Sequence, residues 1–88
     1  MDTESVSDTL SYMGNVFALM LIDQFDYAIN DLNEVIRLEP NNSSAYAVRG
    51  EAYLKKGQYY EAISDYSEAI GLDLNNADAY GSRGQVYL

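Results

Sequence analysis

Apolar side chains recur at helical spacing in two neighbouring stretches of the chain. The first stripe consists of Tyr46, Gly50, Tyr53 and Leu54. The second stripe consists of Tyr59, Ala62, Ile63, Tyr66, Ala69 and Ile70. Positions three and four apart share one face of a helix. Between the stripes, Gly57 is expected to adopt the left-handed conformation that ends a helix. The pattern predicts two antiparallel helices joined by a tight turn, with Ser43 as the N-cap of the first.

This helix pair is repeated along the chain. Residues 43–54 and 77–88 are identical at six of twelve positions, at an offset of 34. The same offset aligns residues 25–42 with 59–76, with eight of eighteen identical. A fixed period of this length is typical of stacked helical repeats, in which each unit buries its apolar face against its neighbour.

Small residues lie inside the apolar stripes. Gly50 and Gly84 are predicted to lie within helices, where glycine costs about 1 kcal/mol relative to alanine. We therefore expect a neighbouring helix to approach each glycine too closely for a side chain. Ala62 and Ala69 are expected to form small faces over which large residues such as Tyr66 lie.

These residues resemble the tetratricopeptide repeat (TPR) family, whose unit is a helix pair of about 34 residues. The matching positions are Tyr46, Gly50 and Tyr53 in the first helix and Ala62, Tyr66 and Ala69 in the second. The resemblance implies an all-α fold of about five helices, in which antiparallel helix-turn-helix repeats stack into a right-handed superhelix, an α-solenoid.

The first repeat can be aligned in two ways. Without gaps, Val16 takes the place of the glycine. With two extra residues between Leu19 and Gln24, the residues Leu10, Met13, Gly14 and Phe17 match the motif directly. We prefer the gapped alignment, which predicts a first helix extended through Leu21–Ile22 and a unit of 36 residues. The predicted organisation is an N-terminal tail (1–6), repeats at 7–42 and 43–76, and the first helix of a partial third repeat (77–88).

The composition argues against catalysis. The chain has no cysteine and no histidine, so the usual ligands of zinc and haem and the usual nucleophiles and bases are lacking. The carboxylate pairs Asp31/Glu34 and Asp65/Glu68 recur on what should be a solvated face. We therefore predict no enzyme activity, no catalytic residue, no metal site and no cofactor.

The charge and hydropathy limit the partners. A net charge of −9 makes binding to nucleic acid or to an anionic membrane improbable. The longest apolar run, Val16–Ile22, is far shorter than the ~20 residues that span a bilayer. Because the first residues are acidic, unlike the start of a signal peptide, we expect a soluble, cytoplasmic protein.

Binding by shape remains, and the TPR resemblance implies a concave groove lined by first helices. Carried over by position, the predicted peptide-binding residues are Ser11, Asn15, Ala47, Val48, Glu51, Leu54, Lys55, Asp78, Gly81, Ser82 and Gln85. TPR domains that grip the C-terminal carboxylate of heat-shock chaperones use Lys, Asn and Arg, and only Asn15 agrees with that clamp. We predict a protein-interaction scaffold that prefers neutral or basic segments of a protein or peptide.

Two further features concern packing. Arg49 and Arg83 occupy equivalent positions, and we expect each to stack on tyrosine and to pair with an acidic residue of the preceding helix. An uncapped stripe of Tyr80, Gly84, Tyr87 and Leu88 would be exposed at the C-terminal end. The alternative function is therefore a self-assembling structural unit, a homo-oligomer formed through this open end.

Overall fold

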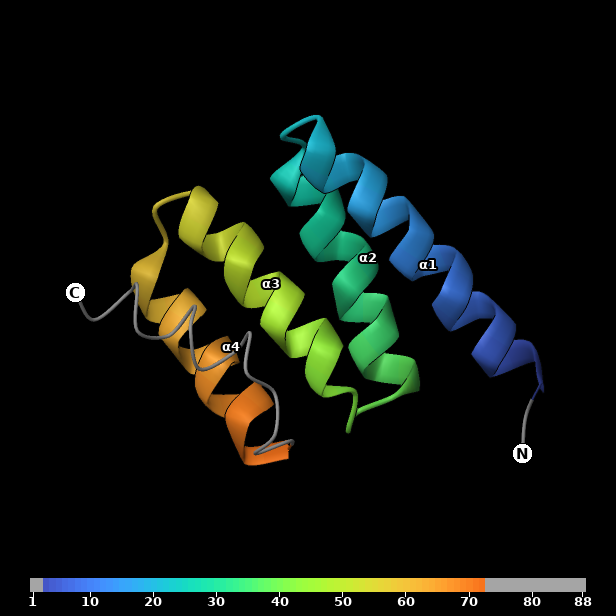
Figure 1. Cartoon of the computed structure of the whole chain (residues 1–88). Helices are drawn as coiled ribbons and strands as arrows, with labels where there is room; N and C mark the ends of the chain where they lie inside the picture. Colours follow the sequence, from blue (N-terminus) through green and yellow to red (C-terminus); the bar gives the residue numbers. More distant parts are fainter. Residues whose placement is uncertain (1–2, 73–88) are drawn as a thin grey trace.

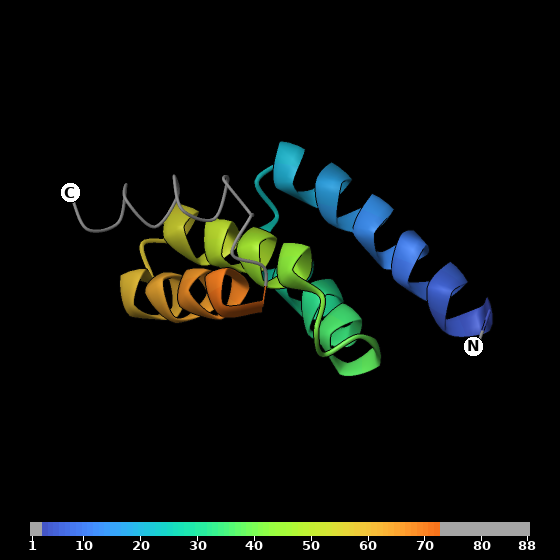
Figure 2. The same cartoon turned by 60° about the horizontal axis from the view of Figure 1, so that its bottom comes forward.

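The computed structural model describes residues 3–72, with side chains from residue 8 onward. This range contains four helices, α1 (Thr3–Leu21), α2 (Phe25–Leu38), α3 (Ser43–Lys55) and α4 (Tyr59–Leu72), and no strand. Each helix runs antiparallel to the next and packs on it (Figures 1 and 2). The all-α helix-turn-helix prediction is confirmed, and the expected helix at 77–88 lies outside the described residues. α1 begins within the stretch predicted as a tail.

The helix boundaries repeat without an insertion. α1 ends at Leu21 and α3 at Lys55, while α2 begins at Phe25 and α4 at Tyr59. Each pair of boundaries is 34 positions apart, so the first helix is not extended through Ile22. The gapped alignment of the first repeat is therefore wrong, and the ungapped alternative describes the molecule. The repeat boundaries at residues 7, 43 and 77 stay predictions.

The second repeat, α3 and α4, contains the close helix approach that the glycine predicts. A Cβ atom added to Gly50 would lie 2.8 Å from Cε1 and 2.9 Å from Cδ1 of Tyr66, closer than real Cβ atoms come. The Tyr66 side chain is 1% exposed, and Ala62 and Ala69 are fully buried. The ring of Tyr66 therefore fills the space that a side chain at position 50 would need.

In the first repeat, α1 and α2, different residues occupy the two equivalent positions. Val16 stands in the place of Gly50, and Leu32 stands in the place of Tyr66. Both are fully buried in one cluster with Ala28, Val35 and Ala45. Leucine is smaller than tyrosine, so the partner leaves room for the valine side chain. Gly14, which the gapped alignment placed here, has nothing within 4 Å of an added Cβ.

The turn within each repeat uses one residue with positive φ. Gly57 has φ +80°, as predicted, and its N–H donates to the carbonyl of Leu54 at 3.0 Å. The next N–H, of Gln58, donates to the carbonyl of Tyr53 at 2.9 Å. In the first repeat the equivalent residue is Asp23, with φ 61°. A side chain is disfavoured in this region, so the first turn is the more strained of the two.

The connection between the repeats is capped one residue earlier than predicted. Ser43 is the first residue of α3, and the N-cap is Asn42. The Asn42 side chain accepts a hydrogen bond from the N–H of Ala45 at 3.0 Å and donates one to Glu39 at 3.0 Å. Asparagine is as good an N-cap as serine, so the cap moves without changing the helix.

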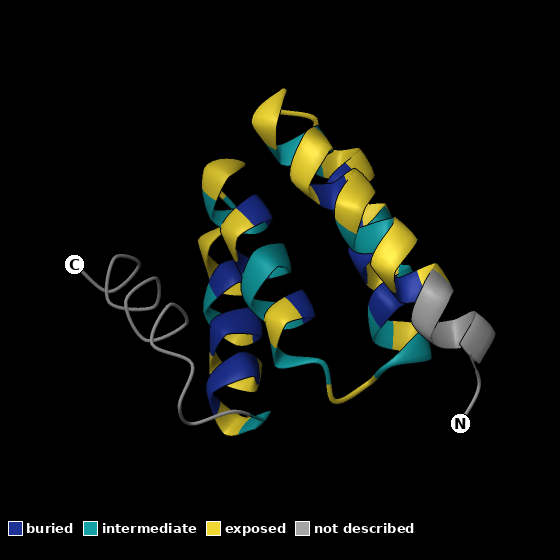
Figure 3. Ribbon diagram, turned by 45° about the vertical axis from the view of Figure 1, so that its right-hand side comes forward, coloured by how far each residue is buried: buried dark blue, intermediate teal, exposed yellow. Residues whose placement is uncertain are grey.

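The core lies along the faces that consecutive helices share. Figure 3 shows buried residues on the facing sides of the helices, whereas much of α1 is exposed. A second, smaller cluster joins α3 to α4 through Ala69 and Ile70, with Tyr46 and Ala47 packed against them. Of the ten predicted stripe positions, five are buried and four are half-buried, and Tyr59 is 57% exposed. The packing therefore leaves the outer side of α1 open.

Candidate functional site

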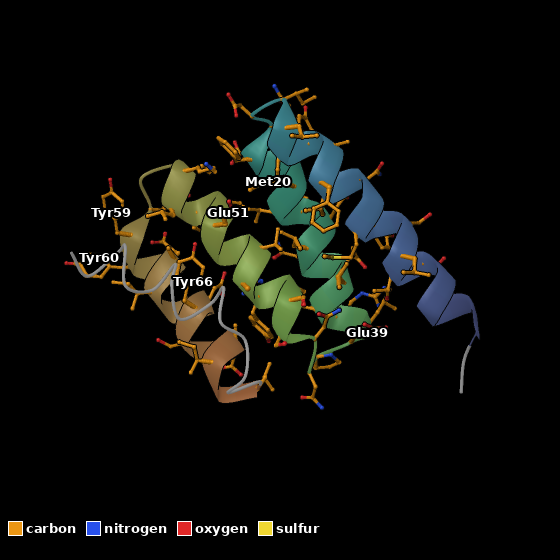
Figure 4. The ribbon with its side chains drawn as sticks, in the orientation of Figure 1. Met20, Glu39, Glu51, Tyr59, Tyr60 and Tyr66 are labelled. Atoms are coloured by element: carbon orange, nitrogen blue, oxygen red, sulfur yellow. The ribbon has the colours of Figure 1, made fainter. Side chains whose placement is uncertain are left out.

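A groove of about 440 Å³ lies between the first helices of the two repeats. Both α1 and α3 pack on α2, so the groove lies between two helices that are held apart by a third. Its lining residues are Phe17, Met20 and Leu21 from α1 and Val48, Glu51 and Lys55 from α3. Figure 4 labels Met20 and Glu51, which line the groove from α1 and from α3.

The two walls of the groove differ in chemistry. On α1, Phe17 is 55% and Leu21 is 85% exposed, although both are large apolar residues. On α3, Val48 is half-buried, while Glu51 and Lys55 are exposed. Glu51 and Lys55 are four residues apart and therefore share one face of the helix. A guest in the groove would meet apolar surface on one side and two opposite charges on the other.

Arg49 holds α3 in place behind the groove. Its guanidinium donates to both carboxylate oxygens of Asp65 on α4, each at 2.7 Å, and to Asn33 Oδ1 on α2 at 2.8 Å. The guanidinium also lies 5.4 Å from the centre of the Tyr46 ring. The hydrogen bonds with Asp65 raise the pKa of Arg49 above its ordinary value. One side chain thus ties three helices together.

The structural role predicted for Arg49 is correct, but its predicted acidic partner is not. The carboxylate belongs to the following helix, and the preceding helix contributes Asn33 instead. Asp65 is 5% exposed, so the expectation that Asp65/Glu68 lies on a solvated face is wrong for Asp65. The interior can hold this carboxylate because a bidentate arginine compensates its charge.

The remaining chemistry of the described residues is limited. Within residues 3–72, no group of three or more acidic, histidine or cysteine side chains is placed to hold a metal ion. Glu34 pairs at 2.8 Å with the neighbouring Arg37 on the surface of α2. None of the four described helices has the length and hydropathy that crossing a bilayer requires.

The predicted groove residues on α3 have different surroundings. Val48, Glu51 and Lys55 line the groove. Ala47 packs instead against the cluster that joins α3 to α4, and Leu54 is half-buried.

The predicted groove residues on α1, Ser11 and Asn15, are exposed and do not line it. They were chosen by the gapped alignment. In the ungapped one, the positions equivalent to Ala47 and Glu51 hold Met13 and Phe17.

Several predicted residues lie outside the described part of the chain. These are the third-repeat groove residues Asp78, Gly81, Ser82 and Gln85, and the self-association residues Tyr80, Gly84, Tyr87 and Leu88. Their roles stay predictions.

The apolar wall formed by Phe17, Met20 and Leu21 was not predicted from the sequence. The sequence did contain a signal for this wall. All seven residues from Val16 to Ile22 are apolar, so apolar side chains point to every side of the helix. A helix that packs on one side buries only one stripe of such a run. The rest of the run must face solvent or a partner.

Two family models match the chain. A model described as "TPR repeat" matches residues 50–88, and one described as "Tetratricopeptide repeat" matches residues 32–64. Together with the helix-turn-helix stack and the Gly50–Tyr66 contact, these matches show that the chain belongs to the tetratricopeptide-repeat family. A search of curated protein sequences finds no match to this chain.

Several solved structures, two of them described as TPR domains, have the same fold. The TPR domain of Arabidopsis OM64 superposes with a TM-score of 0.88 at 26% identity, covering 93% of this chain and 68% of that one. The second TPR of Spaghetti (RPAP3), bound to the HSP90 peptide SRMEEVD, gives 0.88 at 25% identity, covering 98% and 82%. The crystal structure of MamA gives 0.85 at 29% identity, covering 90% and 46%.

Proposed function

We propose that this chain is a non-catalytic interaction module that binds a segment of another protein in the groove between α1 and α3. The observation that carries the proposal is the exposure of Phe17 and Leu21 at the mouth of a groove. Large apolar side chains that are exposed together mark binding surfaces. Removing them from water upon binding supplies about 25 cal/mol per Å² of buried apolar area.

The structural neighbours support a peptide as the guest. The second TPR of Spaghetti (RPAP3) is bound to an HSP90 peptide, and its chain is covered over 82% of its length. The groove here lies between helices of consecutive repeats that share this fold. A peptide segment is therefore the class of ligand that we propose for this chain.

We propose a preference for neutral or basic segments. The peptide SRMEEVD has three acidic residues and one basic residue. The gapped alignment put Ser11 and Asn15 at the positions of the carboxylate clamp, where only Asn15 agrees with it, and the ungapped register replaces them with Met13 and Phe17. No cation then stands at these positions of α1, and Glu51 adds a negative charge opposite. An acidic guest would meet the carboxylate of Glu51 as well as the ammonium of Lys55, and the net charge of −9 of the whole chain disfavours its binding.

Calorimetric titration tests this proposal with two peptides of equal length. One is SRMEEVD, and the other, SRMKKVK, has lysine at each acidic position. We expect the basic peptide to bind about tenfold more tightly, and Phe17→Gln to weaken it. Tyr27→Gln serves as the matched control, because Tyr27 is 63% exposed on α2 and does not line the groove. Tighter binding of the acidic peptide would refute the charge preference, and no binding of either would refute the function.

The alternative function, assembly through the C-terminal end, concerns residues outside the described range, and it stays a prediction. A cytoplasmic location also stays a prediction.

A further inference from the structure

The groove-facing side of α1 carries a continuous apolar seam. The seam consists of Leu10, Met13, Phe17, Met20 and Leu21, which follow one another at intervals of three, four, three and one. Leu10, at 68% exposure, lies two turns before Phe17 on the same side of the helix. Met13 and Met20 are half-buried because they also touch the core. The seam spans about 17 Å, or three helical turns.

The seam contains no charged residue, although the chain as a whole is strongly acidic. From Thr9 to Ile22 the sequence has no charged residue, while the whole chain has a net charge of −9. The equivalent positions of α3 are Ser44, Ala47, Glu51, Leu54 and Lys55. The repeat therefore does not require apolar residues at these positions. Of the two first helices that the structure describes, α1 has the apolar seam and α3 does not.

The spacing of the seam fits a helical guest better than an extended one. Intervals of three and four repeat every seven residues, or about 10.5 Å along a helix. A second helix presents its own apolar residues at the same repeat, so its side chains stay in register with the seam. Side chains on one face of an extended chain recur about every 6.7 Å, which does not match this repeat. A helical guest can thus keep its apolar residues opposite the gaps between seam residues along the whole seam.

We propose that the groove binds an amphipathic helix of about three turns from another protein, with an apolar stripe against the seam and cationic residues along its flank. This proposal rests on the proposed function and specifies its ligand. The cationic flank follows from charge complementarity. The wall opposite Phe17 carries Glu51 and Lys55, whose charges balance each other, so the attraction for cations comes from the net charge of −9 of the chain. The uncharged seam accepts the apolar stripe.

Three sixteen-residue peptides of leucine, alanine and lysine test the proposal. The first has leucine at helical intervals of three and four. The second has the same composition but alternating leucine, and the third has glutamate in place of lysine in the helical pattern. Fluorescence anisotropy on the full chain measures affinity, and circular dichroism measures the helix gained on binding. We expect the first peptide to bind at least about tenfold more tightly than the others and to gain helix. Phe17→Gln should weaken it about tenfold, and Tyr27→Gln should not.

Each outcome decides between the proposals. Equal binding of the helical and alternating basic peptides would overturn the helical guest and leave the proposed function standing. No binding of any peptide would overturn both. Sedimentation of the chain without peptide tests whether a second copy of the chain occupies the seam. If it forms a dimer that Phe17→Gln dissociates, a second copy covers the seam, and a helix from another protein is not its occupant.

Discussion

The two repeats have the same backbone boundaries and differ at the contact between their helices. The second repeat places Tyr66 on Gly50, and the first has Leu32 and Val16 at these positions in one buried cluster. A large residue faces a position without a side chain in one case, and two residues of intermediate size meet in the other. The comparison shows that the packing depends on the combined volume of the pair rather than on a glycine.

The two repeats also differ in the interactions that stabilise their helix pairs. In the second repeat, Arg49 of α3 donates hydrogen bonds to Asp65 of α4 and also to Asn33 of α2, which belongs to the first repeat. The position equivalent to Arg49 in the first repeat is Asn15, which is exposed. The first repeat therefore relies on apolar packing, and its first helix keeps apolar residues on the open side as well. The second repeat is the more tightly fixed framework, and the first supplies the binding surface.

The volume argument predicts the largest effect. We expect Gly50→Val to cost about 3 kcal/mol of unfolding free energy, because the new side chain overlaps the buried Tyr66 ring. Adding Tyr66→Leu recreates the pair found in the first repeat, so the double variant should recover at least about 1 kcal/mol relative to the sum of the two single changes. Urea unfolding of all variants followed by circular dichroism measures this coupling.

The control for that experiment is Gly14→Val. Gly14 has open space around it and lies in α1, so valine there should leave stability unchanged or raise it slightly. Additive effects of the Gly50 and Tyr66 changes would show that the two residues do not share one volume.

The charge network predicts a smaller loss. Arg49→Ala leaves the buried carboxylate of Asp65 without its bidentate partner, and because the Arg49 side chain itself is 20% exposed we expect a loss of about 2 kcal/mol. Arg37→Ala is the matched control, since the Arg37–Glu34 pair is exposed and should contribute less than about 1 kcal/mol. Thermal unfolding of both variants at one pH compares them. Equal losses would contradict the framework role of Arg49.

The turns predict the smallest effect, with opposite signs in the two repeats. Asp23→Gly relieves a side chain at positive φ and should stabilise the fold by about 0.5 to 1 kcal/mol. Gly57→Asp imposes the same strain on the second turn and should destabilise it by a similar amount. The shift in the urea midpoint measures both, and a destabilising Asp23→Gly would show that the aspartate side chain contributes to the turn.

Much of the fold could be read from periodicity, and the site could be read only in part. The helices, the turn at Gly57 and the close approach at Gly50 follow from local spacing and from one residue type. The groove on α3 was partly found, through Val48, Glu51 and Lys55. The wall on α1 was missed because Leu10, Met13, Gly14 and Phe17 imitate the motif. A one-dimensional alignment cannot tell a glycine that touches a ring from one that faces open space.

The sequence alone determined that this chain is a stack of helix pairs, because helical spacing and a period of 34 act through local geometry that each unit repeats. Tertiary structure alone decided which small residue meets which large one, which carboxylate is buried against Arg49, and which apolar residues of α1 remain uncovered. These outcomes depend on how several helices share one volume, and no single helix contains that information.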